Sequence, residues 1–449
     1  MLIKNAIIIT WEQPNRILEG HAVLVRDSLI QRIAPQADLE SEYPHEPVID
    51  AHGQLLMPGV ICAHTHFYGA FSRGMAIPPP APSQFSEILE KLWWPLDQSL
   101  DLQDVKVSAE VCLIDAIKHG TTTLFDHHAS PNAIDGSLDM IRDAFDETGL
   151  RGVVCYEVTD RGGVNKAEAG IAENLRMIKS VNEGNNLGGR LAATFGMHAG
   201  LTLTDETLRK CQEAIGSNTG IHIHVAEHQV DEFDSLEKYG MRVIDRLQLY
   251  GFLGDRSIVA HGVHMDMREA EILANTKTWL AHQPRSNSNN AVGLADVESM
   301  LRLGVRVCIG NDGLSNAMWD EWRSCYLAHK LTGKDPRKMS GDKVIEMGVY
   351  NNAELAAGFF PSTKSLGTIQ EGAPADLILV DYDPITEMTT GNLPWQILFG
   401  FRDSMVTMTM VAGKALMLDR KLTEIDERQV FAEARERSKI VWKRYQEQF

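Results

Sequence analysis

Residues 57–66 read MPGVICAHTH, a short apolar run that closes on two histidines separated by a single threonine. In an extended strand, side chains two residues apart point to the same face, so His64 and His66 can both reach one metal ion. Seven further apolar runs along the chain carry His, Glu or Asp at their ends. This recurrence is typical of a metal site at one end of a barrel, and it indicates a metal-dependent hydrolase.

Helical patterns fill the gaps between these runs, which is the arrangement expected of βα units around a parallel sheet. Eight such units within roughly 300 residues suit a (β/α)8 TIM barrel, which typically takes about 250 residues and more with insertions. We therefore predict an α/β fold built on this barrel. The predicted strands are residues 59–66, 121–128, 151–158, 190–198, 220–228, 257–264, 278–284 and 306–313.

The two ends of the chain have a different texture. Residues 1–57 alternate short apolar runs with turn signals, and residues 366–426 repeat this pattern. We predict that both segments form one small, discontinuous β-sandwich domain, which leaves residues 58–365 to the barrel. In residues 427–449, charged and apolar residues interleave at helical spacing, which predicts a closing amphipathic helix.

The composition is that of a globular protein with a sizeable core, since 44% of its 449 residues are apolar and 23% are charged. A formal net charge of −18 disfavours nucleic acid and anionic membranes as partners, because their phosphates need Lys and Arg. Six scattered cysteines without a C-x-x-C pair predict neither a disulfide framework nor a thiolate zinc site. No stretch approaches the ~18 apolar residues of a membrane span, and no secretory leader is evident, so we expect a cytoplasmic protein.

Four motifs stand at the ends of predicted strands: residues 57–66 on the first, HVAE at 224–227 on the fifth, AHG at 260–262 on the sixth and GNDG at 310–313 on the eighth. In this order they resemble the amidohydrolase superfamily, in particular its cytosine deaminase and chlorohydrolase-like branch. The runs LWWPLD at 92–97 and DHHASP at 126–131 make the SsnA-type aminohydrolases the nearest resemblance within that branch.

This resemblance implies a metal site whose four ligands are His64, His66, His224 and Asp312. Three imidazoles and one carboxylate suit Zn²⁺, our first expectation, or Fe²⁺, and they leave a position for water. A metal held in this way lowers the pKa of bound water toward neutrality and generates hydroxide. Relatives with two metals carry a bridging carbamylated lysine on strand four, and residues 191–198 contain no lysine, so one divalent ion is expected.

Side chains next to the ligands are expected to move protons. By the same resemblance, Glu227 carries a proton from water to a ring nitrogen of the substrate, His261 orients the water, and Asp312 serves as ligand and base. Catalysis of this kind contributes about 10² to 10⁴ in rate. The expected reaction is deamination of an amino-substituted N-heterocycle with release of ammonia. Our first expectation for the ring is a purine or oxidised purine such as guanine or 8-oxoguanine.

Other functions fit the same residues. A chlorohydrolase or a hydrolase of cyclic amides would use the same metal and Glu227 on a different leaving group, and fold alone does not decide among them. A non-catalytic assembly protein on this scaffold would show gaps among the ligands, and none is visible. We therefore expect a small heterocyclic molecule as the partner and, as is common for large barrels of this branch, a homo-oligomer.

Further residues at the strand ends and on the insertion are expected to face the substrate. Arg285, in the loop HQPRSN at 282–287, is the favoured specificity residue because its guanidinium can donate to a carbonyl or a carboxylate. By resemblance, His198 corresponds to a strand-four histidine that contacts substrate in many relatives, although the Pro and Tyr that often follow are absent here. The predicted substrate-binding residues are His198, Arg285, His128, Glu157, His282, Asn287 and Trp94.

A proline-rich insertion follows the first predicted strand. Residues 78–82 read PPPAP and lead into a segment, residues 85–100, that contains Trp93 and Trp94. This segment either places a loop and a helix over the mouth of the barrel or is an ordinary surface excursion, and the sequence leaves both open. Several other histidines are interpreted as hydrogen-bonded structural residues, namely His119, His222, His228, His264 and His329.

Overall fold

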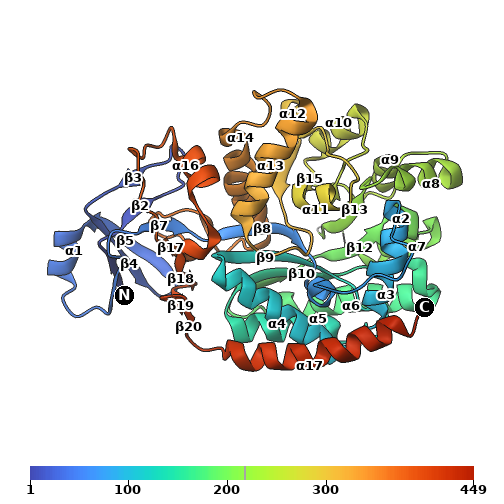
Figure 1. Ribbon diagram of the computed structural model, residues 1–449, viewed down its shortest axis with the longest axis horizontal. Helices are drawn as coiled ribbons and strands as arrows, with labels where there is room; N and C mark the ends of the chain where they lie inside the picture. The colour runs from blue at the N-terminus through green and yellow to red at the C-terminus, as the bar shows by residue number, and fades with distance from the viewer. Residues whose placement is uncertain (217–218) are drawn as a thin grey trace.

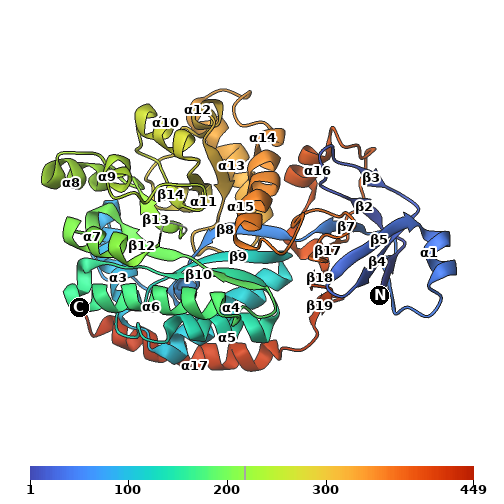
Figure 2. The same ribbon diagram turned by 180° about the vertical axis from the view of Figure 1, so that it is seen from behind.

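The computed structural model describes residues 1–216 and 219–449, and its centre is a parallel β-barrel surrounded by helices (Figure 1, Figure 2). Within these residues the barrel has eight strand positions, which confirms the predicted (β/α)8 fold. The strands are β8 (Val60–Thr65), β9 (Thr121–His128), β10 (Arg151–Tyr156), β11 (Leu191–Ala193) with β12 (Phe195–Ala199), β13 (Ile221–Val225), β14 (Ile258–His261), β15 (Trp279–His282) and β16 (Arg306–Ile309).

The barrel consists of two parallel sheets that join at both edges. The fourth strand position is split between β11 and β12 at Thr194, whose N–H donates to the carbonyl of Val154 on β10 (3.1 Å). On the opposite side, Asn311 follows β16 and donates its N–H to the carbonyl of His64 on β8 (2.9 Å). The strand that carries the paired histidines therefore lies directly beside the strand that leads to Asp312.

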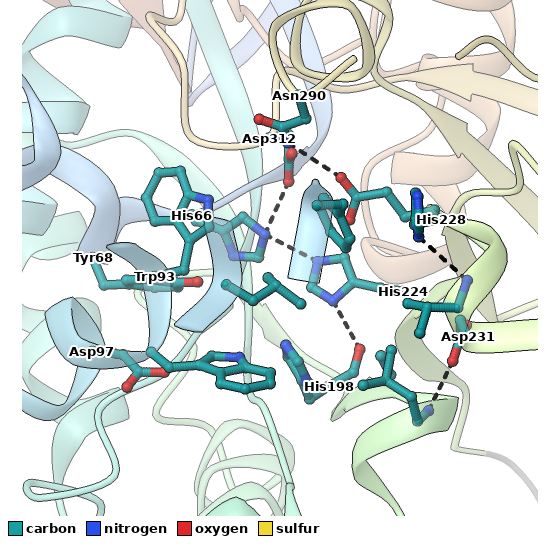
Figure 3. Close-up of a pocket in the computed structure, with 17 residues that line it drawn as sticks. His66, Tyr68, Trp93, Asp97, His198, His224, His228, Asp231, Asn290 and Asp312 are labelled. Atoms are coloured by element: carbon teal, nitrogen blue, oxygen red, sulfur yellow. Dashed lines mark hydrogen bonds and ion pairs between the residues drawn. The ribbon is translucent and has the colours of Figure 1, made fainter. Parts of the chain in front are cut away.

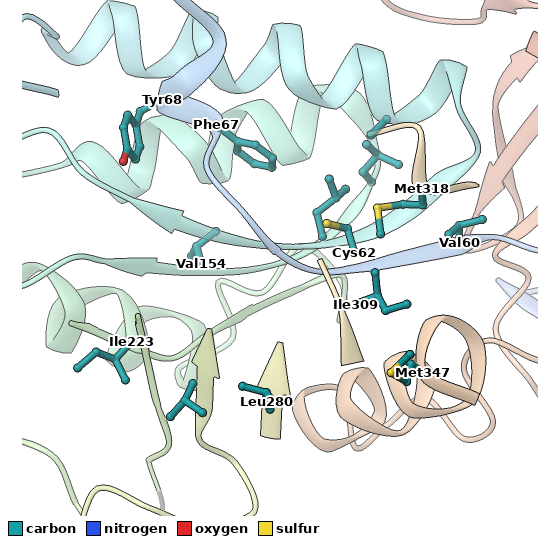
Figure 4. Close-up of a cluster of buried hydrophobic side chains, with 14 of the residues drawn as sticks. Val60, Cys62, Phe67, Tyr68, Val154, Ile223, Leu280, Ile309, Met318 and Met347 are labelled. Atoms are coloured by element: carbon teal, nitrogen blue, oxygen red, sulfur yellow. The ribbon is translucent and has the colours of Figure 1, made fainter. Parts of the chain in front are cut away.

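Helices cover the outside of the barrel, and alternate strand residues pack against them (Figure 4). Val154, Ile223 and Leu280 share one buried apolar cluster with the helical residues Met318 and Met347. The opposite strand faces form a second cluster that includes Ile61, Phe125, Val153, Ala260, Trp279, Ala281 and Cys308. The covering helices include α4 (Leu102–Lys118), α5 (Ser137–Thr148), α6 (Val164–Asn182), α7 (Asp205–Ala214), α8 (Gln229–Tyr239), α9 (Val243–Leu249), α10 (Met267–Thr276), α12 (Val297–Leu303), α13 (Met318–Gly333), α14 (Gly341–Ile345) and α15 (Asn352–Phe359).

Both ends of the chain contribute to a small β-sandwich, as predicted. A four-stranded sheet, β5-β4-β1-β6, and a seven-stranded sheet, β20-β19-β18-β17-β7-β2-β3, enclose a core that contains Ile3, Val23, Leu377 and Met410. The strands are β1 (Leu2–Lys4), β2 (Ile7–Ile9), β3 (Ile17–Leu18), β4 (His21–Arg26), β5 (Leu29–Pro35), β6 (Val48–Asp50), β7 (Leu55–Pro58), β17 (Leu377–Val380), β18 (Val406–Val411), β19 (Lys414–Leu418) and β20 (Lys421–Leu422). The exact domain limits at residues 57, 365 and 426 stay a prediction.

A single residue, Gly59, separates β7 of the sandwich from β8 of the barrel. A Cβ added at this glycine would lie 2.2 Å from the side chain of Thr122, so no larger residue fits here without a shift. β7 pairs antiparallel with β17 from the other end of the chain. The histidine-bearing strand thus continues directly out of the β-sandwich.

The last helix, α17 (Glu427–Gln446), runs along the outside of the barrel and packs on α4. It ends beside α3 (Trp94–Gln98), which belongs to the insertion after the first barrel strand (Figure 1, Figure 2). Among residues 1–216 and 219–449, no helix combines the length and apolar character needed to cross a membrane.

Candidate metal centre

Four side chains converge at the mouth of the barrel. His66 Nε2 lies 3.1 Å from His224 Nε2 and 3.1 Å from Asp312 Oδ1, and His64 Nε2 lies 3.1 Å from the same aspartate oxygen. The three imidazoles are buried, and Figure 3 shows His66, His224 and Asp312 facing one another. These are the four residues predicted as metal ligands, and the fold brings them into one cluster.

The orientation of two of these rings fits a bound cation. His66 Nδ1 lies 2.5 Å from the carbonyl oxygen of His127, and His224 Nδ1 lies 2.8 Å from that of His198. A carbonyl oxygen only accepts hydrogen bonds, so each Nδ1 carries a hydrogen and each neutral ring presents a lone pair at Nε2. Two lone pairs 3.1 Å apart repel each other unless a positive charge lies between them. A divalent metal ion satisfies this requirement, because neutral imidazoles and a carboxylate are ligands that zinc binds.

Nearby carboxylates also favour positive charge at this position. Burial lowers the pKa of His66, but the hydrogen bond and charge of Asp312, together with the charge of Glu157, outweigh burial and raise that pKa to about 9. Burial works against the charged form of Asp312, yet His261 and His64 hold its pKa well below the usual value. The electrostatics of the cluster therefore suit a cation ligated by neutral imidazoles.

An outer layer of side chains fixes the ligands. His222 Nε2 lies 2.8 Å from His64 Nδ1, and Ser286 donates its hydroxyl to Asp312 Oδ2. Outer partners of this kind orient the ligands, and their loss typically lowers metal affinity about 10- to 100-fold. His222 was interpreted as a structural histidine, and its structural role is to hold a predicted ligand.

Glu227 and His261, the residues predicted to move protons, lie beside Asp312. His261 Nε2 is 3.6 Å from Glu227 Oε2 and 3.8 Å from Asp312 Oδ1, and it has no hydrogen-bond partner among the described residues. Asn287 holds the other ring nitrogen at 2.9 Å. Burial raises the pKa of Glu227 to about 7 against the attraction of His261, and the charge of Asp312 adds to the rise. A carboxyl group that titrates near neutrality can both accept and donate a proton.

Backbone strain sets the direction of these side chains. Ala226, His261 and Asp312, at the ends of barrel strands, have φ angles of 48°, 73° and 55°, a region that costs residues other than glycine about 1–3 kcal/mol. In β14, Val259 packs outside the barrel and Ala260 inside, so regular alternation would turn His261 outward. The left-handed conformation of His261 returns its ring to the mouth.

A pocket of about 720 Å³ opens onto these residues (Figure 3). One wall is the insertion, which folds into α2 (Phe85–Ile88), η2 (Leu89–Trp93) and α3, and the start of α8 contributes to another. Phe85 stacks on His228 with ring centroids 5.6 Å apart. The insertion therefore lies over the mouth, which decides between the two open interpretations. The lining includes Tyr68, Phe85, Leu89, Trp93, Trp94, Asp97, His198, Leu201, Glu227, His228, Val230 and Asn290.

Of the predicted substrate-binding residues, Trp94 and His198 line this pocket, whereas Arg285 is held elsewhere. Its backbone N–H and its Nε both donate to the carboxylate of Glu321, and its Nη2 donates to the carbonyl of Ser315 (2.7 Å). The guanidinium thus braces the loop that follows β16. This placement does not support Arg285 as a specificity residue, because its charge is paired with Glu321, and that role stays a prediction.

His282 lies on the outer face of its strand. Ala281 faces the inside of the barrel, so its neighbours Leu280 and His282 face the surrounding helices. His282 Nε2 lies 3.0 Å from His329 Nε2 on α13, and the ligand-type atoms of these two residues and Cys325 lie within 4.8 Å of one another. A direct contact between His282 and the substrate is therefore not supported.

The three remaining predicted residues support the site from behind rather than lining the pocket. Glu157 Oε1 lies 3.1 Å from His127 Nδ1, and although burial opposes its charged form, His127 and neighbouring histidines hold its pKa well below the usual value. His128 is buried, with Nε2 2.9 Å from the hydroxyl of Ser130. Asn287 acts through the ring that it holds. Because none of the three lines the pocket, any effect of these residues on the substrate would be indirect.

Most of the pocket wall was missed by reasoning from the sequence. Phe85, Leu89, Trp93 and Asp97 recur every four residues, so one face of the insertion helix lines the pocket. This spacing is the signal that could have identified them. His228, which was interpreted as structural, also lines the pocket.

Comparison with known proteins agrees with this geometry. The model of the Amidohydrolase family matches residues 55–416. A 5'-deoxyadenosine deaminase of Methanobrevibacter smithii is 30% identical over 445 residues, which cover 97% of this chain and 96% of that protein. A 5-methylthioadenosine/S-adenosylhomocysteine deaminase of Syntrophomonas wolfei subsp. wolfei is 31% identical over 443 residues, which cover 97% and 98% of the two chains.

A solved structure has the same fold. The zinc-bound adenosine deaminase from Xanthomonas campestris superposes with a TM-score of 0.83 at 22% identity, and the match covers 98% of both chains. The family model spans both the barrel and the strands of the sandwich that flank it, including β7 and β17. This chain belongs to the amidohydrolase family.

Proposed function

We propose that this protein is a metal-dependent deaminase of adenosine-type nucleosides. The observation that carries the proposal is the position of Glu227, which lines the aromatic pocket and also faces His261 beside the candidate metal ligands. A site of this construction places a proton carrier between a nucleophile and a bound ring. Hydrolytic deamination requires that arrangement.

In this proposal, His64, His66, His224 and Asp312 hold one divalent ion, with zinc favoured by the ligand types. When bound, such an ion supplies a nucleophile at neutral pH by lowering the pKa of water toward neutrality. The fixed Nδ1 hydrogen bonds of His66 and His224 keep both Nε2 lone pairs aimed at the ion.

The side chains of the chain then carry the proton transfers. Water adds through its oxygen to C6 of the adenine ring, and Glu227 moves a proton from that water to N1. His261 and Asp312 orient the attacking oxygen. Glu227 next takes the remaining proton from the oxygen added at C6 and delivers it to the exocyclic nitrogen, the C6–N bond breaks, and ammonia leaves while C6 becomes the carbonyl of the hypoxanthine nucleoside. One water is consumed and one ammonia is released.

The pocket supports a nucleoside as the substrate. Trp93, Trp94 and Tyr68 line it and offer flat apolar surface to a purine. Asp97 also lines the wall, and its Oδ1 is buried without a hydrogen-bond partner among the described residues. Its other carboxylate oxygen, Oδ2, accepts from Arg161 Nη2 (2.6 Å), so an ion pair holds Asp97 in the wall.

The relatives favour adenosine-type substrates over our first expectation of guanine or 8-oxoguanine. Two of them are described as acting on 5'-deoxyadenosine and on 5-methylthioadenosine or S-adenosylhomocysteine. We keep the purine ring and the deamination reaction from the sequence-based expectation, and we replace the oxidised or free base by an adenine nucleoside.

An ammonia-release assay tests the proposal. The protein is stripped with a chelator, reloaded with zinc and supplied with 5'-deoxyadenosine, 5'-methylthioadenosine, S-adenosylhomocysteine or adenosine. Guanine and 8-oxoguanine serve as comparison substrates for ammonia release, and a chlorinated triazine is followed by release of chloride. We expect ammonia from the adenine nucleosides only, and only with metal restored. Faster turnover of guanine, 8-oxoguanine or the triazine, or full activity after complete metal removal, would contradict the proposal.

A further inference from the structure

The pocket wall formed by the insertion has two faces with different neighbours. Phe85, Leu89, Trp93 and Asp97 line the pocket. Lys91 and Pro95 alternate with them by two residues and therefore lie on the opposite side of the helix. The end of α17 packs beside this segment (Figure 1).

Pro95 interrupts the hydrogen-bond ladder of the wall. Proline has no N–H, so Pro95 cannot donate to the carbonyl of Lys91, four residues earlier. The wall adopts a π-helical turn, η2, at this point, with the Trp94 N–H bonded to Leu89 O. Tyr445 of α17, which is 1% exposed, donates its hydroxyl to the Lys91 carbonyl. A residue from the end of the chain thus supplies a donor that the wall helix lacks.

Two further side chains from the end of the chain bond to the backbone of the same segment. Gln448 donates from Nε2 to the carbonyl of Pro95 (2.7 Å) and to the hydroxyl of Ser99 (2.9 Å). Arg444 donates from Nη1 to the carbonyl of Ser99 (3.1 Å). These contacts repeat along the helix at the spacing of one turn, from Lys91 to Pro95 to Ser99.

The end of α17 is itself firmly anchored. Asp101 and Asp104 form the capping box that begins α4, and Asp104 is fully buried. Arg437 donates from Nε to Asp104 Oδ1 (2.7 Å), and Arg444 donates to Asp104 Oδ2 (2.9 Å) and Asp101 Oδ2 (2.8 Å). Arg437 and Arg444 lie two turns apart on the same face of α17. They therefore tie this helix to the start of α4 immediately before it reaches the pocket wall.

From these contacts we infer that Tyr445, Gln448 and Arg444 are positioning residues for substrate binding, because they hold Trp93, Trp94 and Asp97 in place through the backbone of the wall. Only one part of this inference, the effect on substrate binding, rests on the proposed function; the effect on the pocket wall does not. None of the three side chains lines the pocket, so their loss would loosen the wall without removing a group that touches the substrate.

The test is the double variant Tyr445→Phe/Gln448→Ala, which removes the donors and keeps the tyrosine ring. The matched control is Tyr382→Phe, whose hydroxyl bonds Gln396 on α16 (Leu393–Gly400), in a different part of the molecule. Hydrogen exchange of the metal-loaded proteins is followed by mass spectrometry in peptides that cover residues 85–99. We expect exchange there to be about tenfold faster in the double variant and unchanged in the control, since three hydrogen bonds to this segment are lost.

Kinetics distinguish positioning from general stabilisation. In the double variant, KM for the adenine nucleoside should rise about tenfold while kcat stays within about twofold and metal content is unchanged. A fall in kcat at constant KM, or unchanged exchange in residues 85–99, would overturn the inference. If the double variant folds poorly, Gln448→Ala alone replaces it, because Gln448 is exposed. This single variant should show the same changes on a smaller scale. If the wild-type protein deaminates no nucleoside, the proposed function fails. The exchange experiment still decides whether Tyr445 and Gln448 hold the pocket wall in place.

Discussion

Two pairs of histidines in this molecule meet nitrogen to nitrogen at nearly the same distance. In the mouth pair, His66 Nε2 and His224 Nε2 are 3.1 Å apart, and in the flank pair, His282 Nε2 and His329 Nε2 are 3.0 Å apart. The mouth pair lies among candidate ligands at the end of the barrel. The flank pair lies between the outer face of β15 and α13, with Cys325 nearby.

The far nitrogen of each ring distinguishes the pairs. Both Nδ1 atoms of the mouth pair point at backbone carbonyls, so each ring, when neutral, presents its lone pair at Nε2. His282 Nδ1 has no partner among the described residues, so either ring of the flank pair can carry its hydrogen on Nε2. Burial lowers the pKa of His282, and it lowers that of His329 to about 4, so a neutral N–H···N hydrogen bond satisfies this pair. The length of a histidine contact does not identify a metal site, whereas the partner of the far nitrogen does.

The largest expected difference between the pairs is in metal content. His224→Ala should lose the ion. Its activity should fall further than the about 10- to 100-fold that is typical when a residue holding a ligand is lost. His329→Ala should keep about one ion per chain, because the flank pair needs none. Elemental analysis of both purified variants measures this directly. Retention of metal by the first variant, or its loss from the second, would reverse the distinction.

Removing the proton carrier should separate metal binding from catalysis. Glu227→Gln should lower kcat by about 10²- to 10⁴-fold while metal content stays at the wild-type level. Glu298→Gln, which changes a carboxylate beside the flank pair, should leave kcat unchanged. Steady-state kinetics with parallel metal analysis provide the measurement. Activity of Glu227→Gln within tenfold of wild type would remove Glu227 from the mechanism.

The outer layer of the mouth pair should have a smaller effect. His222→Phe keeps a ring but removes the nitrogen that lies 2.8 Å from His64 Nδ1, so metal affinity should fall about 10- to 100-fold. The same substitution at His282 should leave metal affinity unchanged. Competition with a chromogenic chelator reports both affinities. Equal losses of metal affinity in the two variants would mean that the flank pair also supports the metal site.

The smallest effect is expected on stability alone. His329→Phe removes the partner of a buried imidazole, so the free energy of unfolding should fall by about 1–3 kcal/mol. Metal content and kcat should not change. Denaturant titration of the metal-loaded protein measures the first quantity. A loss of metal in this variant would show that the flank pair is coupled to the mouth after all.

The barrel was predictable because its strands are short apolar runs that end in polar residues. The predicted strand 121–128 coincides with β9, and MPGVICAHTH spans the junction of β7 and β8. The break at Thr194 was not predictable, because it depends on which neighbouring strand each half of the fourth position meets. Such pairing is a tertiary property.

The candidate site was likewise predictable only in part. The motifs gave the residues that cluster, but side-chain direction depends on backbone angles that the sequence does not state. His261 faces inward only because its φ is 73°, whereas His282 follows the regular alternation of its strand and faces outward. The pairing of Arg285 with Glu321 could not be predicted, because Glu321 lies 36 residues further along the chain. The assignment of ligands and catalytic residues stays a prediction that the variants above test.

The passage of one strand through Gly59 has a kinetic consequence. β8, which carries His64, continues through Gly59 into β7, and β7 pairs with β17 in the sandwich sheet. By linkage, a bound ion would in turn slow the opening of that sheet, since a ligand stabilises every state that retains its site. Backbone hydrogen exchange in β7 and β17 should therefore be slower with metal bound than without it.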